Sequence, residues 1–85
     1  MVYTVIFAKS AQKELNKIPK PFGNRILEKV ETLAEQPRPH GCIKLEGSDN
    51  TYRIRVGDYR VIYSIYDKEL VVDVIKIDHR KQVYR

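Results

Sequence analysis

The segment YRIRVGDYRVIYSIY, residues 52–66, decides the fold of this chain. It contains two runs rich in valine, isoleucine and tyrosine, residues 52–56 and 59–66, and these residue types favour β-strands. Gly57 and Asp58 separate the runs, and a glycine-containing pair is typical of a two-residue hairpin turn. The segment therefore predicts a tight antiparallel β-hairpin.

Alternation along the hairpin predicts two faces of different chemistry. With a two-residue turn, Arg55 lies directly opposite Arg60, and Arg53 lies two residues along on the same face. The opposite face is apolar and aromatic, and we expect it to form the core against helices. Its residues are Tyr52, Ile54, Val56, Tyr59, Val61, Tyr63 and Ile65.

Two further strands are expected outside the hairpin. Residues 2–7 are mostly β-branched or aromatic, and residues 69–77 are rich in valine and isoleucine. Asp67 and Lys68 separate the last strand from the hairpin, and we expect them to form a second two-residue turn.

Two short antiparallel helices are expected between the first strand and the hairpin. Ser10 is expected to cap the first helix, and Pro19 to end it. Pro21 suits the first turn of the second helix. Each helix has one apolar stripe, which comprises Ala11, Leu15 and Ile18 in the first and Phe22, Ile26, Val30 and Leu33 in the second.

These elements predict a single domain, residues 1–85, in the order strand, helix, helix, strand, strand, strand. Residues 37–50 hold prolines, glycines and short polar residues, and we expect a loop that Ile43 and Leu45 anchor to the core. Helices grouped before a meander of strands predict an α+β fold with a twisted, mainly antiparallel sheet. Both helices are expected on one face, which leaves the other open to a partner.

Size and composition narrow the possible functions. A chain of 85 residues is too short to enclose a large cavity, so any site is expected on an open face. Its net charge of +5 indicates an anionic partner such as nucleic acid, the ribosome or an acidic protein. The single cysteine, Cys42, excludes an internal disulfide framework. Since no apolar run could span a bilayer, we expect a cytoplasmic protein without a membrane partner.

Arg53, Arg55 and Arg60 are the candidate functional residues of the hairpin. Like charges directly opposite one another in a sheet are destabilising, and arginine binds phosphate through two parallel hydrogen bonds. The cluster therefore indicates an anion site. The alternative is that these arginines are solvated and cover apolar surface with their stems, or that Asp58 or Asp73 neutralises one of them.

Other chemistries lack the residues they need. Two histidines without clustered carboxylates do not indicate a metal site, and no glycine-rich loop indicates a phosphate-bearing cofactor. No cofactor or metal is therefore expected. Cys42 is interpreted as a small hydrophobic residue, and His40 lies in a loop without a recognisable signal. Residues 77–85 are expected to leave the last strand, where Tyr84 is either a functional group or a hydrophobic clip.

The hairpin string, residues 52–63, and the tail His79-Arg80-Lys81-Gln82-Val83-Tyr84 together resemble the RelE branch of the RelE/ParE toxin superfamily. The resemblance covers essentially the whole chain. It implies the toxin of a type II toxin–antitoxin pair, which enters the ribosome and cuts messenger RNA there without a metal ion. In that reaction the 2′-hydroxyl of the RNA attacks the adjacent phosphorus. It also implies a small RelB-like antitoxin, and operator DNA as a partner only through the toxin–antitoxin complex.

The resemblance also implies catalytic residues. Family members use two basic residues on the first strand of the meander, an arginine after the turn, a tail arginine and a C-terminal tyrosine. These positions are occupied here by Arg53, Arg55, Arg60, Arg80 and Tyr84. Well-known members carry lysine at the first two positions, and arginine cannot give up its proton, so charge stabilisation is expected there rather than proton transfer.

Arg60 and Arg80 are expected to clamp the phosphate, while Tyr84 acts as the general base or stacks on a nucleobase. A tyrosine with a pKa near 10 is a poor base, so nearby arginines would have to lower its pKa. The remaining tail contacts to RNA are expected from His79, Lys81 and Arg85, with His79 also a candidate proton donor to the departing oxygen.

Two other functions stay open within the same superfamily. The ParE branch shares the scaffold but inhibits DNA gyrase by binding, and an inactive homologue would serve only as an antitoxin-binding co-repressor. Tyr84 after His79 and Arg80 favours the nuclease. Likeness of fold alone does not decide, because one scaffold hosts unrelated functions.

Overall fold

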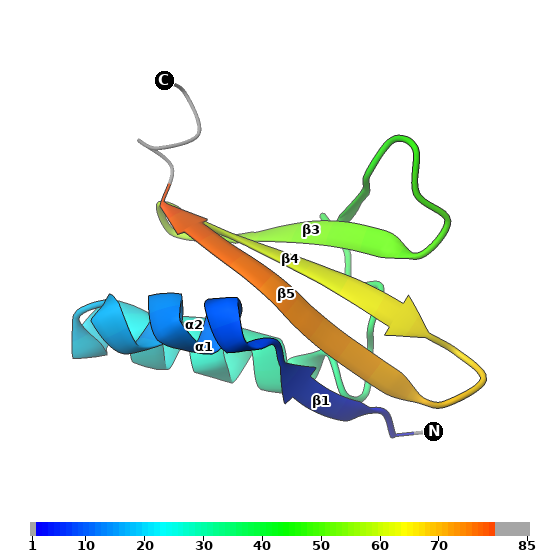
Figure 1. The fold of residues 1–85 in the computed structure, drawn as a ribbon, viewed down its shortest axis with the longest axis horizontal. Coiled ribbons are helices and arrows are strands. Elements are labelled where there is room, and N and C mark those ends of the chain that lie inside the picture. Colours follow the sequence, from blue (N-terminus) through cyan, green and yellow to red (C-terminus); the bar gives the residue numbers. More distant parts are fainter. Residues whose placement is uncertain (1, 80–85) are drawn as a thin grey trace.

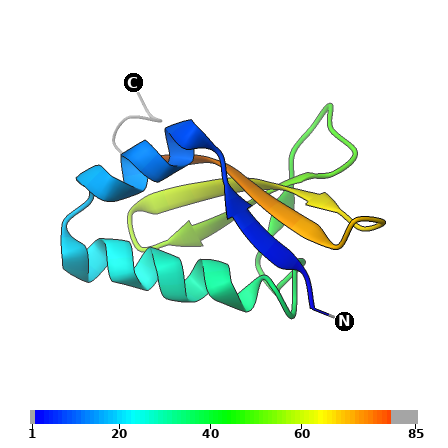
Figure 2. The same ribbon diagram turned by 60° about the horizontal axis from the view of Figure 1, so that its bottom comes forward.

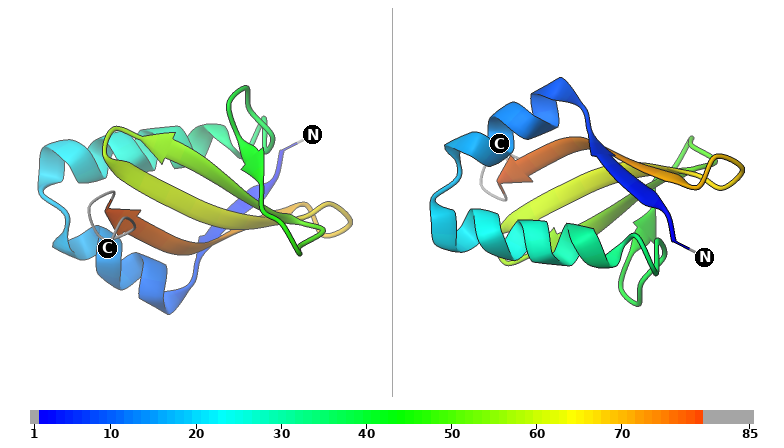
Figure 3. Two further views of the ribbon diagram at one scale, coloured as in Figure 1. Left: turned by 90° about the horizontal axis from the view of Figure 1, so that it is seen from above. Right: turned by 90° about the horizontal axis from the view of Figure 1, so that it is seen from below.

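The structure is a computed structural model that describes residues 2–79. In this part of the chain two helices cover one face of a five-stranded sheet, and the other face carries no helix (Figure 1, Figure 3). The elements are β1 (Thr4–Phe7), α1 (Lys9–Lys17), α2 (Lys20–Thr32), β2 (Ile43–Lys44), β3 (Thr51–Val56), β4 (Tyr59–Tyr66) and β5 (Val71–His79). The predicted α+β fold is confirmed.

The sheet has the strand order β1-β5-β4-β3-β2. Its pairs are antiparallel except for β1 and β5, the first and last strands, which run parallel side by side (Figure 2). A parallel pair needs a long crossover, and α1, α2 and the meander of β2 to β4 together supply it. The sheet is therefore mixed, and mainly antiparallel as predicted.

The hairpin of β3 and β4 has the predicted register. Val56 lies opposite Tyr59, and Arg55 lies opposite Arg60. Gly57 has a φ of 61°, which suits the first central position of a type II′ turn. The face predicted to be apolar contacts the helices, because Ile54, Val61, Tyr63 and Ile65 are buried and Tyr52, Val56 and Tyr59 pack beside them.

Residues from both helices complete the core. From the predicted stripes, the buried side chains are Ala11, Leu15, Ile26, Val30 and Leu33. Phe22 is an exception, since it is 47% exposed and packs its ring on Tyr59 with a centroid distance of 6.3 Å. It lies in the first turn of α2, so the predicted apolar stripe is only partly shielded from solvent at this end of the helix.

The start of α1 differs from the prediction. Ala8 occupies the N-cap position and makes no capping hydrogen bond through its side chain. Its backbone N–H donates to the carbonyl of Val74 at 2.9 Å, so pairing with β5 continues to the residue before the helix and fixes where the helix starts. Ser10 lies within α1 and donates to the carbonyl of Ile75 at 3.3 Å, so its predicted capping role was wrong. Pro21 does occupy the first turn of α2.

Two predicted connections also differ. The loop after α2 contains the short strand β2, whose Ile43 pairs with Arg53; Ile43 is 49% exposed and therefore does not anchor the loop in the core. The turn after β4 spans residues 67–70 rather than two residues. Leu70 adopts a φ of 57° there, and its carbonyl accepts the N–H of Thr4 at 2.7 Å, which ties this turn to β1. Neither α1 nor α2 has the length and apolar character needed to cross a membrane.

Candidate functional site

Arg53, Arg55 and Arg60 lie on the sheet face away from the helices, and we call this set the arginine face. Arg55 and Arg60 are direct cross-strand partners, and Arg53 is two residues from Arg55 on the same strand. Arg55 is exposed, whereas the other two are half-buried. The structure thus brings together the three hairpin arginines that the sequence predicted as one cluster.

A carboxylate that the sequence analysis missed also lies on this face. Asp78 of β5 is the cross-strand partner of Arg60. The β4–β5 register shifts between Ile62 and Tyr63, and this β-bulge determines which residues at the end of β5 share a face with Arg60. Asp78 also pairs with Lys76, with 3.5 Å between Oδ2 and Nζ. Nothing in the sequence marks a bulge at this point, so this neighbour could not be predicted.

His79 lies on the helix side of the sheet. Its cross-strand partner is Tyr59, and the two rings meet edge to face with a centroid distance of 4.9 Å. Tyr59 in turn contacts Phe22. The structure therefore separates His79 from the arginine face, and its predicted RNA contact stays a prediction.

The other predicted tail residues lie outside the described part of the chain. These are Arg80, Lys81, Tyr84 and Arg85. Their convergence with the arginine face stays a prediction.

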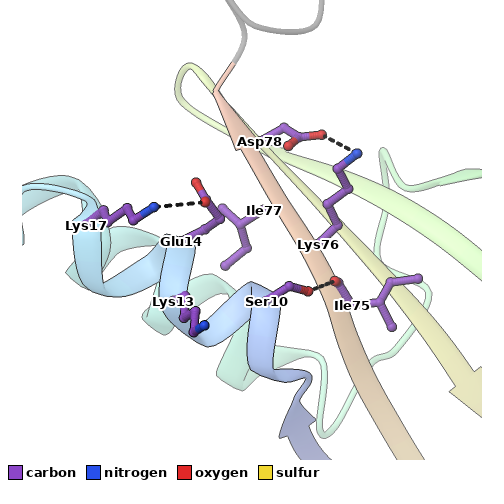
Figure 4. A pocket seen from close by; sticks show the side chains of 8 residues that line it. All are labelled: Ser10, Lys13, Glu14, Lys17, Ile75, Lys76, Ile77 and Asp78. Carbon is purple, nitrogen blue, oxygen red and sulfur yellow. Dashed lines mark hydrogen bonds and ion pairs between the residues drawn. The ribbon is translucent and has the colours of Figure 1, made fainter.

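A groove of about 370 Å³ separates α1 from the end of β5 (Figure 4). The groove carries charges of both signs. On α1, Glu14 pairs with Lys17 at 3.7 Å, and on the other side of β5, Asp78 pairs with Lys76. Lys13 also lines it. With two of its three lysines paired to carboxylates, this groove offers less unpaired positive charge than its lysine content suggests.

Arg38, at the other end of the sheet, donates three hydrogen bonds. Its Nη2 donates to Asp67 Oδ2 at 2.8 Å and its Nη1 to Oδ1 at 3.3 Å, while its Nε donates to the Tyr52 hydroxyl at 3.1 Å. The Tyr3 hydroxyl donates to the same carboxylate at 2.6 Å. The hydrogen bonds from Arg38 and Tyr3 hold the pKa of Asp67 below its usual value, and the bond to Asp67 raises the pKa of Tyr3. We call Arg38, Asp67, Tyr3 and Tyr52 the Arg38 network.

Tyr63 is the buried neighbour of this network. Its ring stacks on Tyr52 at 6.1 Å, and its hydroxyl donates to the carbonyl of Pro37 at 2.8 Å. Burial raises the pKa of this phenol. Tyr63 thus joins the loop after α2 to the core. Across residues 2–79, no group of three or more histidine, cysteine, aspartate or glutamate side chains is placed to hold a metal ion.

Comparison with known proteins defines the class of this protein. The family model for the ParE toxin of type II toxin–antitoxin systems, parDE, matches residues 5–84. Toxin RelG of Mycobacterium tuberculosis is 31% identical over 86 residues, which cover 100% of this chain and 99% of RelG. The mRNA interferase toxin RelE of Escherichia coli strain K12 is 30% identical over 84 residues, which cover 96% of this chain and 87% of RelE. The class is therefore the toxin of a type II toxin–antitoxin system.

Solved structures agree with this class. The chain matches the archaeal RelE–RelB complex from Pyrococcus horikoshii OT3 with a TM-score of 0.84 and 40% identity, over 94% of this chain and 97% of that one. It matches the intact Escherichia coli RelBE complex with a TM-score of 0.81 and 29% identity, over 91% and 95%. The chain belongs to the RelE/ParE superfamily and is a RelE-type toxin, as its hairpin and tail residues indicated.

Proposed function

We propose that this toxin is a ribosome-dependent endoribonuclease that cuts messenger RNA without a metal ion. The observation that carries the proposal is the direct opposition of Arg55 and Arg60, with Arg53 beside them, on a sheet face that no helix covers. A relative that is 30% identical is named an mRNA interferase, which supports the same activity.

The proposed reaction is an internal transfer at one RNA phosphate. The 2′-oxygen forms a bond to the adjacent phosphorus while the bond from phosphorus to the 5′-oxygen breaks. The 2′-hydroxyl proton goes to a general base, and the departing 5′-oxygen receives a proton. The products are a 2′,3′-cyclic phosphate and a 5′-hydroxyl end.

The arginine face would act on the transition state of this step. Negative charge builds on the phosphate oxygens as the fifth bond to phosphorus forms, and preorganised cations bind that state more strongly than the ground state. We assign this charge stabilisation to Arg55 and Arg60, with Arg53 as a further contact. The carboxylate of Asp78, opposite Arg60, would hold this guanidinium in one orientation.

Tail residues would supply the proton transfers. We propose Tyr84 as the general base or as a stacking surface, and Arg80 as a second phosphate clamp. Lys81 and Arg85 would contact the RNA backbone. His79 lies on the helix side, against Tyr59, so a direct role for it would require the substrate or the side chain to reach around the strand end.

The ribosome would supply what the toxin lacks. The arginine face offers guanidiniums, and Lys76 and Asp78 of β5 lie beside it. Among the described residues of this face there is no histidine poised for proton transfer. Ordering the messenger in a reactive geometry can lower the barrier by several kcal/mol. A weak set of acid and base groups is therefore consistent with a substrate that the ribosome positions.

We further propose a small RelB-like antitoxin as the cognate partner in the cytoplasm, with operator DNA bound only through the complex. Solved structures of RelE relatives include RelE–RelB complexes from Pyrococcus horikoshii OT3 and Escherichia coli. An exposed cationic sheet face is complementary to an acidic segment that would cover it.

The rival functions are gyrase inhibition and a purely regulatory role. The matching family model is described as a ParE toxin, and this observation supports gyrase inhibition as the alternative function. Tyr84 after His79 and Arg80 favours the nuclease over both rivals.

Mapping 5′ ends after induced expression tests the proposal. Two copies of one transcript are compared, of which one has lost its start codon and is not translated. We expect new ends only in the translated copy, and fewer of them in Tyr84→Phe. Cuts in both copies would exclude ribosome dependence, and cuts in neither copy would favour gyrase inhibition or an inactive homologue.

A further inference from the structure

A second cationic feature lies at the outer edge of β3. It is a pocket of about 240 Å³ between α2, the loop before β2 and the strand edge. It borders the arginine face, because two arginines belong to both. The pocket is lined by Lys29, His40, Gly41, Ile43, Arg53, Ile54 and Arg55.

The charged groups of this pocket are all basic. Lys29 approaches from α2, and Arg53 and Arg55 approach from β3, while no acidic residue lines the pocket. Among residues 2–79, no ion pair or hydrogen bond joins these three side chains to another residue. This differs from the groove beside α1, where both carboxylates face lysines. The pocket thus concentrates positive charge that this part of the chain does not neutralise.

The strand edge adds a backbone donor. The N–H of Leu45 donates to the carbonyl of Thr51 at 2.9 Å, so Thr51 directs its backbone groups toward the β2 side. In an antiparallel ladder every second residue does the same, which places the N–H of Arg55 on that side. The β2–β3 ladder ends with Ile43 opposite Arg53, so it does not extend to Arg55. The Arg55 N–H therefore faces the pocket beyond the end of β2.

We propose that this pocket binds the phosphate of a nucleotide next to the one that is cut, with Lys29 and the Arg55 N–H as its ligands. The inference rests on the proposed nuclease function and extends it. Arg53 and Arg55 connect the two sites, so one RNA strand lying on the arginine face would continue over the edge of β3. A compact ammonium, a backbone N–H and guanidiniums are the groups that bind phosphate.

The salt dependence of RNA binding tests the pocket. The probe is a short single-stranded RNA in which every 2′-hydroxyl is methylated, so that it cannot be cut. Its affinity for the full chain is measured by fluorescence anisotropy at several salt concentrations. We expect Lys29→Gln to reduce the slope of log affinity against log salt by about 0.7, the value for one lost phosphate contact on a single strand.

Lys20→Gln is the matched control, because Lys20 is an exposed lysine on the same helix that does not line this pocket. It should leave the slope unchanged, and both variants should keep the melting temperature of the wild type. In NMR spectra of the wild type, the probe should shift the amide signals of Arg55 and Gly41.

Equal slopes for Lys29→Gln and the wild type would overturn the inference. So would a Lys29→Gln variant that binds RNA normally but loses affinity for the antitoxin, since the pocket would then serve an acidic protein segment. Either result is distinct from failure of the nuclease proposal, which is measured by transcript cutting in the wild type.

Discussion

Two arginines that lie near opposite ends of β4 have different surroundings. Beyond its C-terminal end, Arg38 donates three hydrogen bonds, two to Asp67 and one to Tyr52. At its N-terminal end, Arg60 has Arg55 as its cross-strand partner on one side and Asp78 on the other. The first setting matches one cation with several hydrogen-bond acceptors, whereas the second places two cations directly opposite each other with one carboxylate, Asp78, beside Arg60.

We interpret this difference as one between a structural arginine and proposed functional ones. Hydrogen bonds between charged groups stabilise a fold, and like charges opposite each other in a sheet destabilise it. We interpret the second arrangement, on an open face, as a proposed site for an anionic partner such as a phosphate. If this is correct, substitutions in the Arg38 network and around Tyr63 change stability, and substitutions on the arginine face change activity.

The substitution Arg60→Ala is expected to have the largest effect, and this effect is on catalysis. Loss of one preorganised cation at the reacting phosphate should lower the rate of transcript cutting about 100-fold or more. Growth arrest should disappear while circular dichroism shows a folded protein. Arg25→Ala, on the exposed surface of α2, is the control and should remain toxic. A folded Arg60→Ala variant with full toxicity would contradict the assignment.

Tyr63→Phe should affect stability instead. It removes the hydroxyl that donates to the carbonyl of Pro37 at 2.8 Å, and such a bond contributes about 1 kcal/mol. The melting temperature should fall by about 4–8 °C for a domain of this size, with cutting preserved below the transition. Tyr66→Phe, at an exposed position, should melt like the wild type. Equal melting temperatures for the wild type and Tyr63→Phe would show that the bond is not needed.

The stability that the Arg38 network contributes is expected to depend on pH through Asp67. Its hydrogen bond from Arg38 lowers the carboxyl pKa in the folded state, so the unfolded state binds the proton first as pH falls. The stabilisation is fully present above the unfolded pKa near 4 and is lost as pH falls through the folded pKa. Thermal melts of Asp67→Asn should therefore lie below those of the wild type at neutral pH and approach them in acid.

Asp49→Asn is the control for that series, because Asp49 is an exposed loop carboxylate. Its melting curves should follow those of the wild type at every pH. An Asp67→Asn variant that keeps the full acid dependence of the wild type would mean that other carboxylates cause it.

The smallest expected effect is a gain in stability from Arg55→Gln. Removing one of two opposed charges should raise the free energy of unfolding by a few tenths of a kcal/mol, as urea titration would measure. Transcript cutting should fall in the same variant. Arg25→Gln provides the comparison for loss of an exposed charge on α2. If Arg55→Gln lowers stability, Arg55 belongs with Arg38 among the structural arginines.

Much of the site on the hairpin could be predicted from local sequence. Gly57 with Asp58 sets a two-residue turn, and period-two alternation then fixes both the opposition of Arg55 and Arg60 and the burial of Ile54 and Val61. The buried residues of both helices could be predicted equally well from their apolar stripes, except at Phe22. These features depend on residues close together in the chain.

The remaining features depend on tertiary contacts that local patterns do not encode. Asp78 meets Arg60 because of a bulge in the β4–β5 ladder, and β2 exists because two loop residues pair with β3. Ser10 does not cap α1 because the pairing of Ala8 with β5 fixes the start of that helix. The pocket beside Lys29 arises where β2 stops, and a strand of two residues has no detectable periodicity.

The most direct test of the proposed chemistry removes the attacking 2′-oxygen from the substrate. A messenger is translated in a purified system with the toxin, and the nucleotide on the 5′ side of the mapped cut carries a 2′-deoxyribose. We predict that cutting at that position is lost, while the all-ribose messenger yields a 2′,3′-cyclic phosphate and a 5′-hydroxyl end. Cutting of the deoxy-substituted messenger at the same position would contradict attack by the 2′-hydroxyl, and with it the proposed role of the arginine face.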